Sequence, residues 1–181
     1  MEIINFPIYD QGQIGPCTAN ALAAAVEYDR LRSGQEPVFI PSRLFLYYNE
    51  RKLEGSVASD AGAYIRDGVK SLNQLGICPE TEWPYVPTPA ESEGGSFPTG
   101  SAPATQPPQQ AYNEAANHRI SSYQALQQIL SQLQGCFSLW VSIRLRIHGL
   151  PKLVQHRVHG HSSSVLVRLG RRRARCTCGG I

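Results

Sequence analysis

Residues 10–28, DQGQIGPCTANALAAAVEY, join a polar turn interrupted by glycines to a mostly apolar segment with helical spacing. The alanine-rich composition of this segment favours an α-helix. Its apolar positions lie three, four and seven residues apart, at Ala19, Leu22, Ala23 and Val26. Cys17 therefore falls in the first turn of a predicted buried helix. Unpaired N–H groups and the helix dipole at that end favour a thiolate, the nucleophilic form of cysteine.

A side-chain amide precedes this cysteine by six residues, at Gln11. The intervening Gly12 and Gly15 allow the loop to fold back, so that the Gln11 amide and the Cys17 backbone N–H point at one spot. Two convergent donors beside a thiolate form an oxyanion hole. The alternative for Cys17 is an ordinary buried thiol.

The pattern QGxxGxC over residues 11–17, followed by alanine and asparagine, resembles the nucleophile segment of papain-like cysteine peptidases. Within that family it is most similar to the bacterial branch. The resemblance implies that Cys17 is the nucleophile, that Gln11 is the oxyanion-hole glutamine, and that the substrate is a peptide or protein. Two positions depart from the family: Thr18 stands where an aromatic residue is usual, and Ile14 where many relatives carry a disulfide cysteine.

The length of 181 residues suits one domain or two small lobes with a buried core. The chain starts without a charged and then apolar leader, and no apolar run approaches the ~18 residues of a membrane span. We therefore expect a cytoplasmic protein without a membrane partner. Five cysteines, odd in number and unevenly spread, argue against a dense disulfide framework. The sequence implies no cofactor.

The net charge of +3 conceals a separation of charge along the chain. Residues 1–114 carry all fourteen acidic residues and seven Lys or Arg, a formal charge of −7. Residues 115–181 carry ten basic residues and no acidic one, a formal charge of +10. Such a segregated positive segment either binds an anionic partner or was not selected as part of this protein.

Two further helices are predicted in the N-terminal half. Residues 42–53 have helical spacing, and Asp60 is a candidate cap for a third helix. The segments PSRLFLYYNERKLEG, residues 41–55, and GICPETEWPY, residues 76–85, resemble corresponding blocks of the bacterial papain-like branch. In that family a glycine-rich segment before the third helix lines the substrate cleft. The resemblance makes Gly62 a candidate cleft residue.

The C-terminal half predicts one more helix and one strand. A helix capped by Ser121 or Ser122 presents a leucine- and isoleucine-rich face and ends at Gly135. Apolar residues then alternate with mostly polar ones over residues 137–147, the pattern of a half-buried strand. This order of helix, glycine and strand is also how the second lobe of the papain-like family begins.

These patterns predict an α+β, papain-like fold of two lobes. Residues 1–85 form a helical lobe around a central helix, and residues 86–111, rich in proline, glycine and serine, form a loop or linker. Residues 112–149 start an incomplete β-rich lobe, and residues 150–181 form an atypical basic segment. The resemblance covers about residues 6–135.

A papain-like peptidase also needs a histidine on a strand and an asparagine that orients it. His161 follows a glycine, precedes an apolar run and lies 144 residues after Cys17, which suits the spacing in this family. His148 and His159 are alternatives. The chain has no asparagine or aspartate after Asn117 to fill the orienting position.

The basic segment, residues 150–181, contains a cluster of arginines and has no acidic partner for them. Its composition is typical of out-of-frame translation of GC-rich DNA, and we expect it to pack poorly. It holds four potential zinc donors: His159, His161, Cys176 and Cys178. Their C-x-C spacing differs from the usual C-x-x-C, so the sequence predicts no metal site.

Three functions remain open on the sequence alone. The first is a papain-like cysteine peptidase that hydrolyses peptide bonds. The second is a truncated or frameshifted, non-catalytic papain-like fragment. The third is a basic segment that binds nucleic acid or an anionic surface, which is disfavoured because aromatic residues do not alternate with the arginines.

Overall fold

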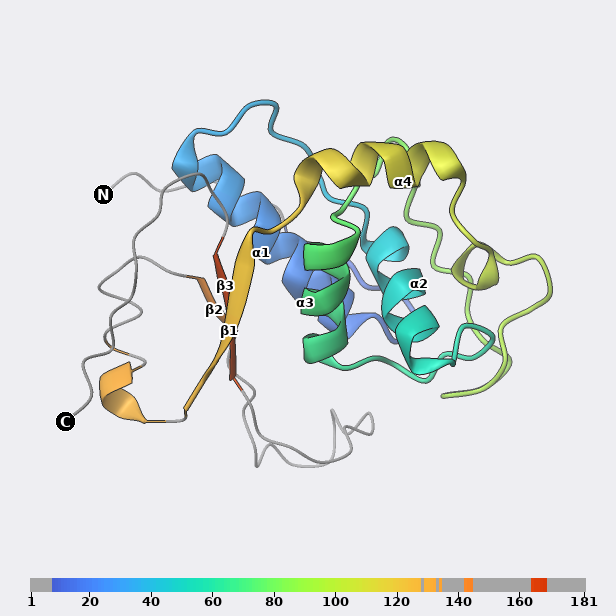
Figure 1. The fold of residues 1–181 in the computed structure, drawn as a ribbon. Helices are drawn as coiled ribbons and strands as arrows, with labels where there is room; N and C mark the ends of the chain where they lie inside the picture. The colour runs from blue at the N-terminus through green and yellow to red at the C-terminus, as the bar shows by residue number, and fades with distance from the viewer. Residues whose placement is uncertain (1–7, 128, 133, 135–141, 145–163, 169–181) are drawn as a thin grey trace.

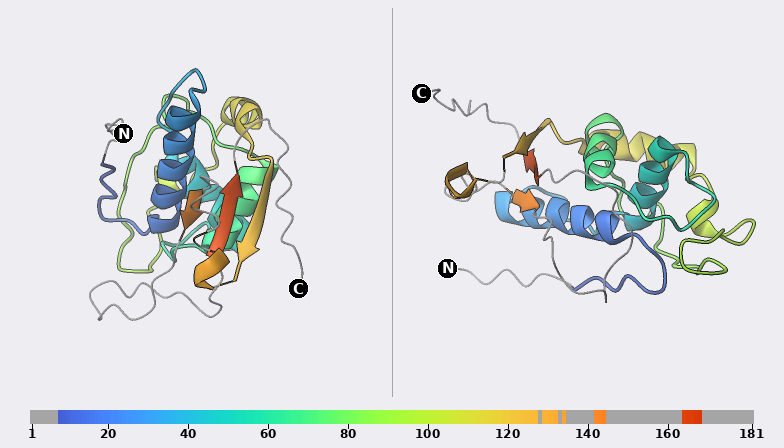
Figure 2. Two further views of the ribbon diagram at one scale, coloured as in Figure 1. Left: turned by 90° about the vertical axis from the view of Figure 1, so that its left-hand side faces the viewer. Right: turned by 90° about the horizontal axis from the view of Figure 1, so that it is seen from below.

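The computed structural model describes residues 8–127, 129–132, 134, 142–144 and 164–168. The elements in chain order are α1 (Cys17–Ser33), α2 (Arg43–Glu54), α3 (Ile65–Gln74), the short 3-10 helix η1 (Ala102–Ala104), α4 (Gln109–Ala115), the 3-10 helix η2 (Ala116–His118), and the strands β1 (Ser122–Leu126), β2 (Ser142–Arg144) and β3 (Ser164–Arg168). The helices pack together, and the strands form a small sheet beside α1 and α3 (Figures 1 and 2). The predicted α+β class is confirmed. Of the helices in these described ranges, none has the length and apolar composition of a membrane span.

Helix α1 begins at Cys17, as the sequence predicts. Pro16 precedes it, and its carbonyl accepts the first backbone hydrogen bond, from Asn20 N at 2.9 Å. The helix ends at Gly34, whose left-handed φ of 61° lets its N–H reach the last carbonyls of the helix. One face of α1 is fully buried in the main core.

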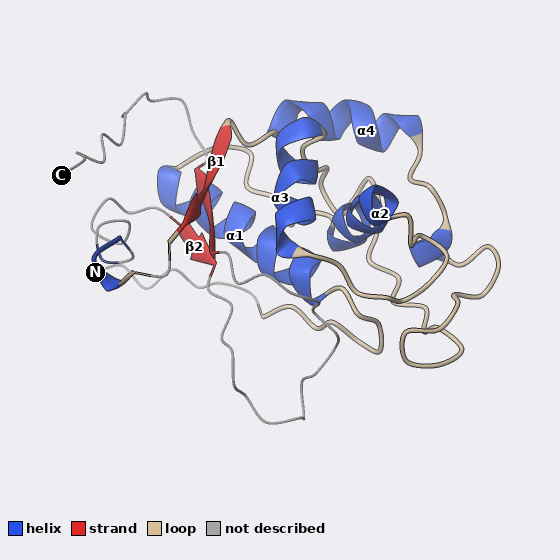
Figure 3. Ribbon diagram, turned by 60° about the horizontal axis from the view of Figure 1, so that its bottom comes forward, coloured by secondary structure: helices blue, strands red, loops and turns tan. Residues whose placement is uncertain are grey.

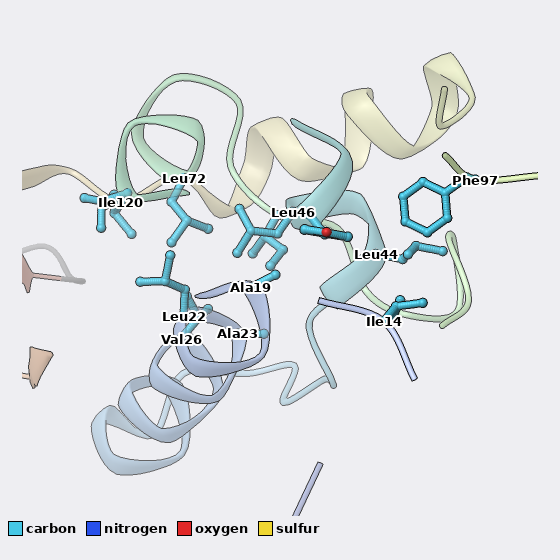
Figure 4. Close-up of a cluster of buried hydrophobic side chains, with 13 residues drawn as sticks. Ile14, Ala19, Leu22, Ala23, Val26, Leu44, Leu46, Leu72, Phe97 and Ile120 are labelled. Atoms are coloured by element: carbon cyan, nitrogen blue, oxygen red, sulfur yellow. The ribbon is translucent and has the colours of Figure 1, made fainter. Parts of the chain in front are cut away.

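The main core lies between α1, α2 and α3 (Figure 4). It contains Ile14, Ala19, Leu22, Ala23, Val26, Leu44, Leu46, Tyr47, Val69, Leu72, Ile77, Phe97 and Ile120. Ile14 is the one member from the turn before Cys17, and only 4% of it is exposed. Burying an isoleucine of this kind stabilises a fold by ~1.5–3 kcal/mol. A buried side chain therefore anchors the turn that precedes Cys17.

Helix α2 agrees with its predicted span. Ser42 caps it by accepting a hydrogen bond from Phe45 N at 3.2 Å, and Gly55 ends it with a φ of 72°. Every residue from Arg43 to Arg51 is buried, polar ones included. This is because α2 lies between the other helices and the loops, so both its faces are covered (Figure 3).

Helix α3 begins later than predicted. Its N-terminal cap position is Tyr64, whose N–H donates to Glu54 Oε1 at 2.8 Å, and the proposed cap Asp60 makes other bonds. Within α3, Gly68 touches Leu22 and Glu50 so closely that an added Cβ would overlap both side chains. Only glycine lets α3 approach the other two helices to this distance.

Residues 86–108 are irregular apart from η1, as expected for a loop, and part of this segment packs on the helical lobe; the last residues of the loop predicted over 86–111 belong to α4. Phe97 is 6% exposed and joins the main core. Its N–H donates to Ala58 O at 2.9 Å, while Arg51 Nη2 donates to Pro103 O at 2.5 Å. The loop therefore forms one wall of the helical lobe. The division of the chain at residues 85, 111 and 149 stays a prediction.

The sheet has the order β1-β3-β2, and both pairs are antiparallel. Ser122 pairs with Arg168 and Leu126 with Ser164, while Ser142 pairs with Val167. The sheet lies on the side of the molecule away from α2 (Figures 2 and 3).

One sequence prediction needs correction here. The helix predicted from Ser121 or Ser122 to Gly135 is wrong over residues 122–126, which form β1, and helical residues occur only at 130–132 and 134 within the described part of that span. Hydrogen bonding to β3 outweighs the local helical spacing. Residues 150–181, which we expect to pack poorly, contribute an ordered element over 164–168, because β3 is the central strand of the sheet. The predicted strand over 137–147 is confirmed at residues 142–144.

Candidate active site

The candidate nucleophile Cys17 is the first residue of α1 and is exposed. It follows a tight turn, in which Gly12 has a φ of 63° and its N–H donates to Asp10 Oδ1 at 2.9 Å. The thiol is thus presented at the end of a buried helix, where incoming molecules can reach it.

Asp60 fixes the last part of this turn. Its Oδ1 and Oδ2 accept from Gly15 N at 2.9 and 3.1 Å, and its Oδ1 also accepts from Tyr47 OH at 2.5 Å. A Cβ added at Gly15 would lie 3.1 Å from Asp60 Oδ1 and 3.4 Å from Tyr47 Oη, so a side chain there would crowd this contact. Asp60 therefore acts as a clamp on residues 10–16, which we call the nucleophile turn. It holds Gly15 across a separation of forty-five residues in sequence. In the sequence Asp60 resembles a cap of the nearest helix, and its bond to Gly15 becomes visible only in the fold.

Gln11 lies in the same turn as Cys17. Its Nε2 donates to Ile14 O at 2.8 Å, and its own backbone carbonyl accepts from Tyr85 OH at 2.8 Å. The first of these bonds closes the turn across the residues that separate Gln11 from the cysteine. The role of Gln11 as an oxyanion donor stays a prediction.

Gly62 lies against the nucleophile turn. It has a left-handed φ of 70°, and a Cβ added to it would lie 3.9 Å from Gly15 O. An L-amino acid here would be strained by its backbone conformation and would point a side chain at the turn. This placement next to the residues preceding Cys17 is compatible with the cleft role that the family resemblance implies.

The electrostatics of Cys17 differ from the sequence expectation. Although the Cys17 side chain is exposed, the protein packed around it removes part of the hydration of the thiol and raises its pKa, and the nearby carboxyl groups of Glu50 and Asp60 raise the pKa further. The backbone N–H groups of Thr18 and Cys17 lower the pKa, as expected at a helix start, but they do not outweigh the other effects. A helix N-terminus alone does not make this cysteine a thiolate.

Thr18 takes the place of the usual aromatic residue and forms a buried bond. Its Oγ1 donates to Glu50 Oε2 at 2.9 Å, between α1 and α2. Burial raises the pKa of Glu50 well above its ordinary value, and its Oε1 has no hydrogen-bond partner. Burial with a single donor therefore favours the protonated form of Glu50, which lies directly behind the nucleophile helix.

The structure places Gln11 in the turn that precedes Cys17 and Gly62 against Gly15 of that turn, whereas His161 lies outside the described residues. The alternatives His148 and His159 lie outside them as well, as do Cys176 and Cys178. Among the described residues, no three His, Cys, Asp or Glu side chains gather as a metal site would require.

Sequence reasoning missed the polar residues of α2, which include Arg43, Tyr47 and Glu50. A signal was present, since charged residues interrupt a stretch of α2 that is otherwise apolar and aromatic. Such residues are almost never fully buried unless they are paired, so their presence on a core helix indicates specific partners.

Comparison with known proteins gives related peptidases. Xylellain, a cysteine protease from Xylella fastidiosa, superposes with a TM-score of 0.73 and is 50% identical, over 77% of this chain and 52% of that one. This chain resembles papain-like cysteine peptidases in sequence and fold. An uncharacterized peptidase C1-like protein of Acanthamoeba polyphaga mimivirus is 42% identical over 106 residues, 59% of this chain and 30% of that protein.

A more distant papain-like structure agrees in fold. The cysteine protease CMS1MS2 of Carica candamarcensis, solved in complex with E-64, has a TM-score of 0.50 at 18% identity, over 74% of this chain and 53% of that one. The papain-like fold predicted from the sequence is confirmed. No family model matches the chain. The chain spans about half of xylellain and under a third of the viral relative.

Proposed function

We propose that this protein is a cysteine peptidase in which Cys17 attacks the carbonyl carbon of a peptide bond. The observation that carries the proposal is the exposed cysteine at the first position of the central helix, behind a glycine turn, in a chain 50% identical to xylellain. The substrate is a peptide or protein, since this chemistry acts on an amide.

The reaction divides between four residues. The Cys17 sulfur forms a bond to the carbonyl carbon, and the Gln11 amide with the Cys17 N–H stabilises the resulting oxyanion. The C–N bond then breaks, and the amine leaves with the proton that a histidine, which we assign to His161, has taken from the Cys17 thiol. Water hydrolyses the thioester and regenerates the thiol. Gly62 borders the substrate.

Two observations bear on the histidine. The raised pKa of the Cys17 thiol means that this cysteine needs a cationic neighbour to form a thiolate, and an imidazolium supplies that charge. The strand expected after His161 is present as β3, which begins at Ser164 and pairs with β1 and β2. The first observation supports a cationic partner for Cys17, and the second supports its assignment to His161.

The proposal is tested by hydrolysis of fluorogenic peptides with the full chain and two matched cysteine variants. Cys17→Ala abolishes hydrolysis. Cys78→Ala, which alters a buried thiol packed with Phe45, Ala111 and Ala115, retains it. His161→Ala lowers kcat about 10²–10⁴-fold, the typical value of general acid–base catalysis, and His159→Ala does not. If the wild-type chain shows no turnover, it is the non-catalytic fragment of the second hypothesis.

A further inference from the structure

Arg43 connects three segments around the nucleophile turn. Its Nη1 donates to Asp10 O at 2.8 Å and to Asn20 Oδ1 at 3.2 Å, while Nη2 donates to Glu80 Oε1 at 2.9 Å. Arg43 is only 9% exposed, so its bonds are shielded from water. The planar guanidinium is suited to this task because it presents several donors in fixed directions.

Tyr85 lies directly against this arginine. The Arg43 guanidinium carbon is 3.7 Å from the centre of the Tyr85 ring, a cation–π contact. The Tyr85 hydroxyl donates to Gln11 O at 2.8 Å. Arg43 and Tyr85 therefore hold two consecutive main-chain carbonyls, those of Asp10 and Gln11.

Asn20 extends the same unit to the other side of the turn. Its Nδ2 donates to Pro16 O at 2.9 Å while its Oδ1 accepts from Arg43. Pro16 precedes Cys17 directly. One connected set of bonds therefore reaches the backbone on both sides of the turn, at Gln11 and just before the cysteine.

We propose that Arg43 and Tyr85 are positioning residues of the candidate active site, which set the main chain of Gln11 relative to Cys17. The inference rests on the proposed function, because it explains how the oxyanion donor is held. The Gln11 side chain bonds within its own turn, so its placement follows that of its backbone. An oxyanion hole must be placed to within ~0.5 Å, and misplacement lowers the rate of reaction more than the binding of substrate.

Tyr85→Phe is the sharpest test, because it removes one hydroxyl and keeps the ring under Arg43. We expect kcat for peptide hydrolysis to fall about two- to tenfold, the net value of one hydrogen bond, with KM little changed. Alkylation of Cys17 by iodoacetamide, which forms no oxyanion, keeps its rate. The matched control is Tyr112→Phe, which removes a hydroxyl bonded to Asn49 Oδ1 at 3.0 Å in a different part of the fold and leaves kcat unchanged.

Arg43→Lys is the second variant, because it keeps the charge opposite Glu80 but loses the planar fork. We expect kcat to fall about tenfold. In the double variant with Tyr85→Phe, the fall in kcat should be smaller than the product of the two single falls, because both residues hold the same segment. Unfolding by urea confirms that each variant is folded. A Tyr85→Phe variant whose kcat equals that of wild type, or whose KM alone changes, overturns the proposal.

Hydrogen exchange separates this inference from the proposed function. In the Tyr85→Phe variant the amides of residues 11–15 exchange at least about threefold faster than in wild type or Tyr112→Phe, because the segment has lost an anchor. If wild type shows no turnover but this acceleration is seen, the peptidase proposal fails and the positioning role stands. If turnover is present and exchange in residues 11–15 is unchanged, the positioning role fails and the peptidase proposal stands.

Discussion

Asp60 and Glu50 both place a carboxyl group near Cys17, but the regions around them offer these groups different numbers of hydrogen-bond donors. Asp60, on the loop before α3, receives hydrogen bonds from Gly15 N and Tyr47 OH. Glu50, between the helices, receives one bond from Thr18 and keeps an unpartnered oxygen. A carboxyl group that accepts several donors stabilises the structure around it, whereas one buried with a single donor costs free energy unless it is protonated.

The largest effect is expected from Asp60→Ala. This change leaves the Gly15 N–H and the Tyr47 hydroxyl without their acceptor, and hydrogen bonds to charged groups contribute about 1.5–3 kcal/mol each. We expect the free energy of unfolding, measured with urea, to fall by about 3 kcal/mol. The control Asp67→Ala removes a partly exposed pair with Lys70 at 2.8 Å and costs under about 1 kcal/mol. Equal losses for the two variants would contradict the clamp assigned to Asp60.

A smaller effect of opposite sign is expected from Glu50→Gln. The pKa of Glu50 is raised in the folded state, so wild type binds a proton that the unfolded chain has released, and stability is lost as the pH rises above the unfolded pKa towards the folded one. Glutamine can still accept from Thr18 but does not ionise. At pH 8 the variant should therefore be more stable than wild type, because the difference between the folded and unfolded pKa of Glu50 destabilises wild type and not the variant.

Urea unfolding at several pH values measures this difference. The stability gain of Glu50→Gln over wild type should shrink as the pH is lowered towards 4, where Glu50 is protonated in both states. Glu91→Gln, at an exposed glutamate, serves as the control and should show no such pH-dependent gain. A gain that is the same at pH 4 and pH 8 would mean that Glu50 is not the titrating group.

The smallest effect concerns the thiol itself. The Glu50 carboxylate raises the pKa of Cys17, so Glu50→Gln should lower that pKa by a fraction of a unit. The pH dependence of iodoacetamide labelling, followed by peptide mapping, gives this pKa. Cys78 is an internal reference, because burial raises the pKa of its thiol to about 12 and it should label much more slowly than Cys17. An unchanged Cys17 midpoint in Glu50→Gln would show that the two groups are not coupled.

The contacts of Asp60 and Glu50 differ from the features of the fold that could be predicted from the sequence. The start of α1 at Cys17 and the span of α2 were predictable, because periodic apolar residues, a serine cap and glycine stops are local signals. The partners of Asp60 and Glu50 were not, since each bonds to a residue more than thirty positions away. Contacts between residues so far apart along the chain cannot be identified from one sequence.

The sheet shows the same limit. Residues 122–126 combine a polar start with apolar positions that also suit a helix, and only the presence of β3 decides the outcome. In the candidate site, the position of Cys17 at the start of α1 was predictable because its motif is contiguous, while the roles of Cys17, Gln11 and Gly62 stay predictions. The residues that hold them, Arg43 and Tyr85 above all, act across the fold and were not predictable.

The order β1-β3-β2 also has a consequence for synthesis of the protein. The strand at the centre of the sheet is the last of the three to leave the ribosome, and within the described residues β1 and β2 each pair with β3, so neither pairing can form until residues 164–168 have emerged. The contacts of α1, α2 and α3 are all encoded before residue 75 and can form much earlier. Throughout that interval the nascent chain carries a helical body with exposed strand edges, which is the stage at which pairing with a neighbouring chain is easiest.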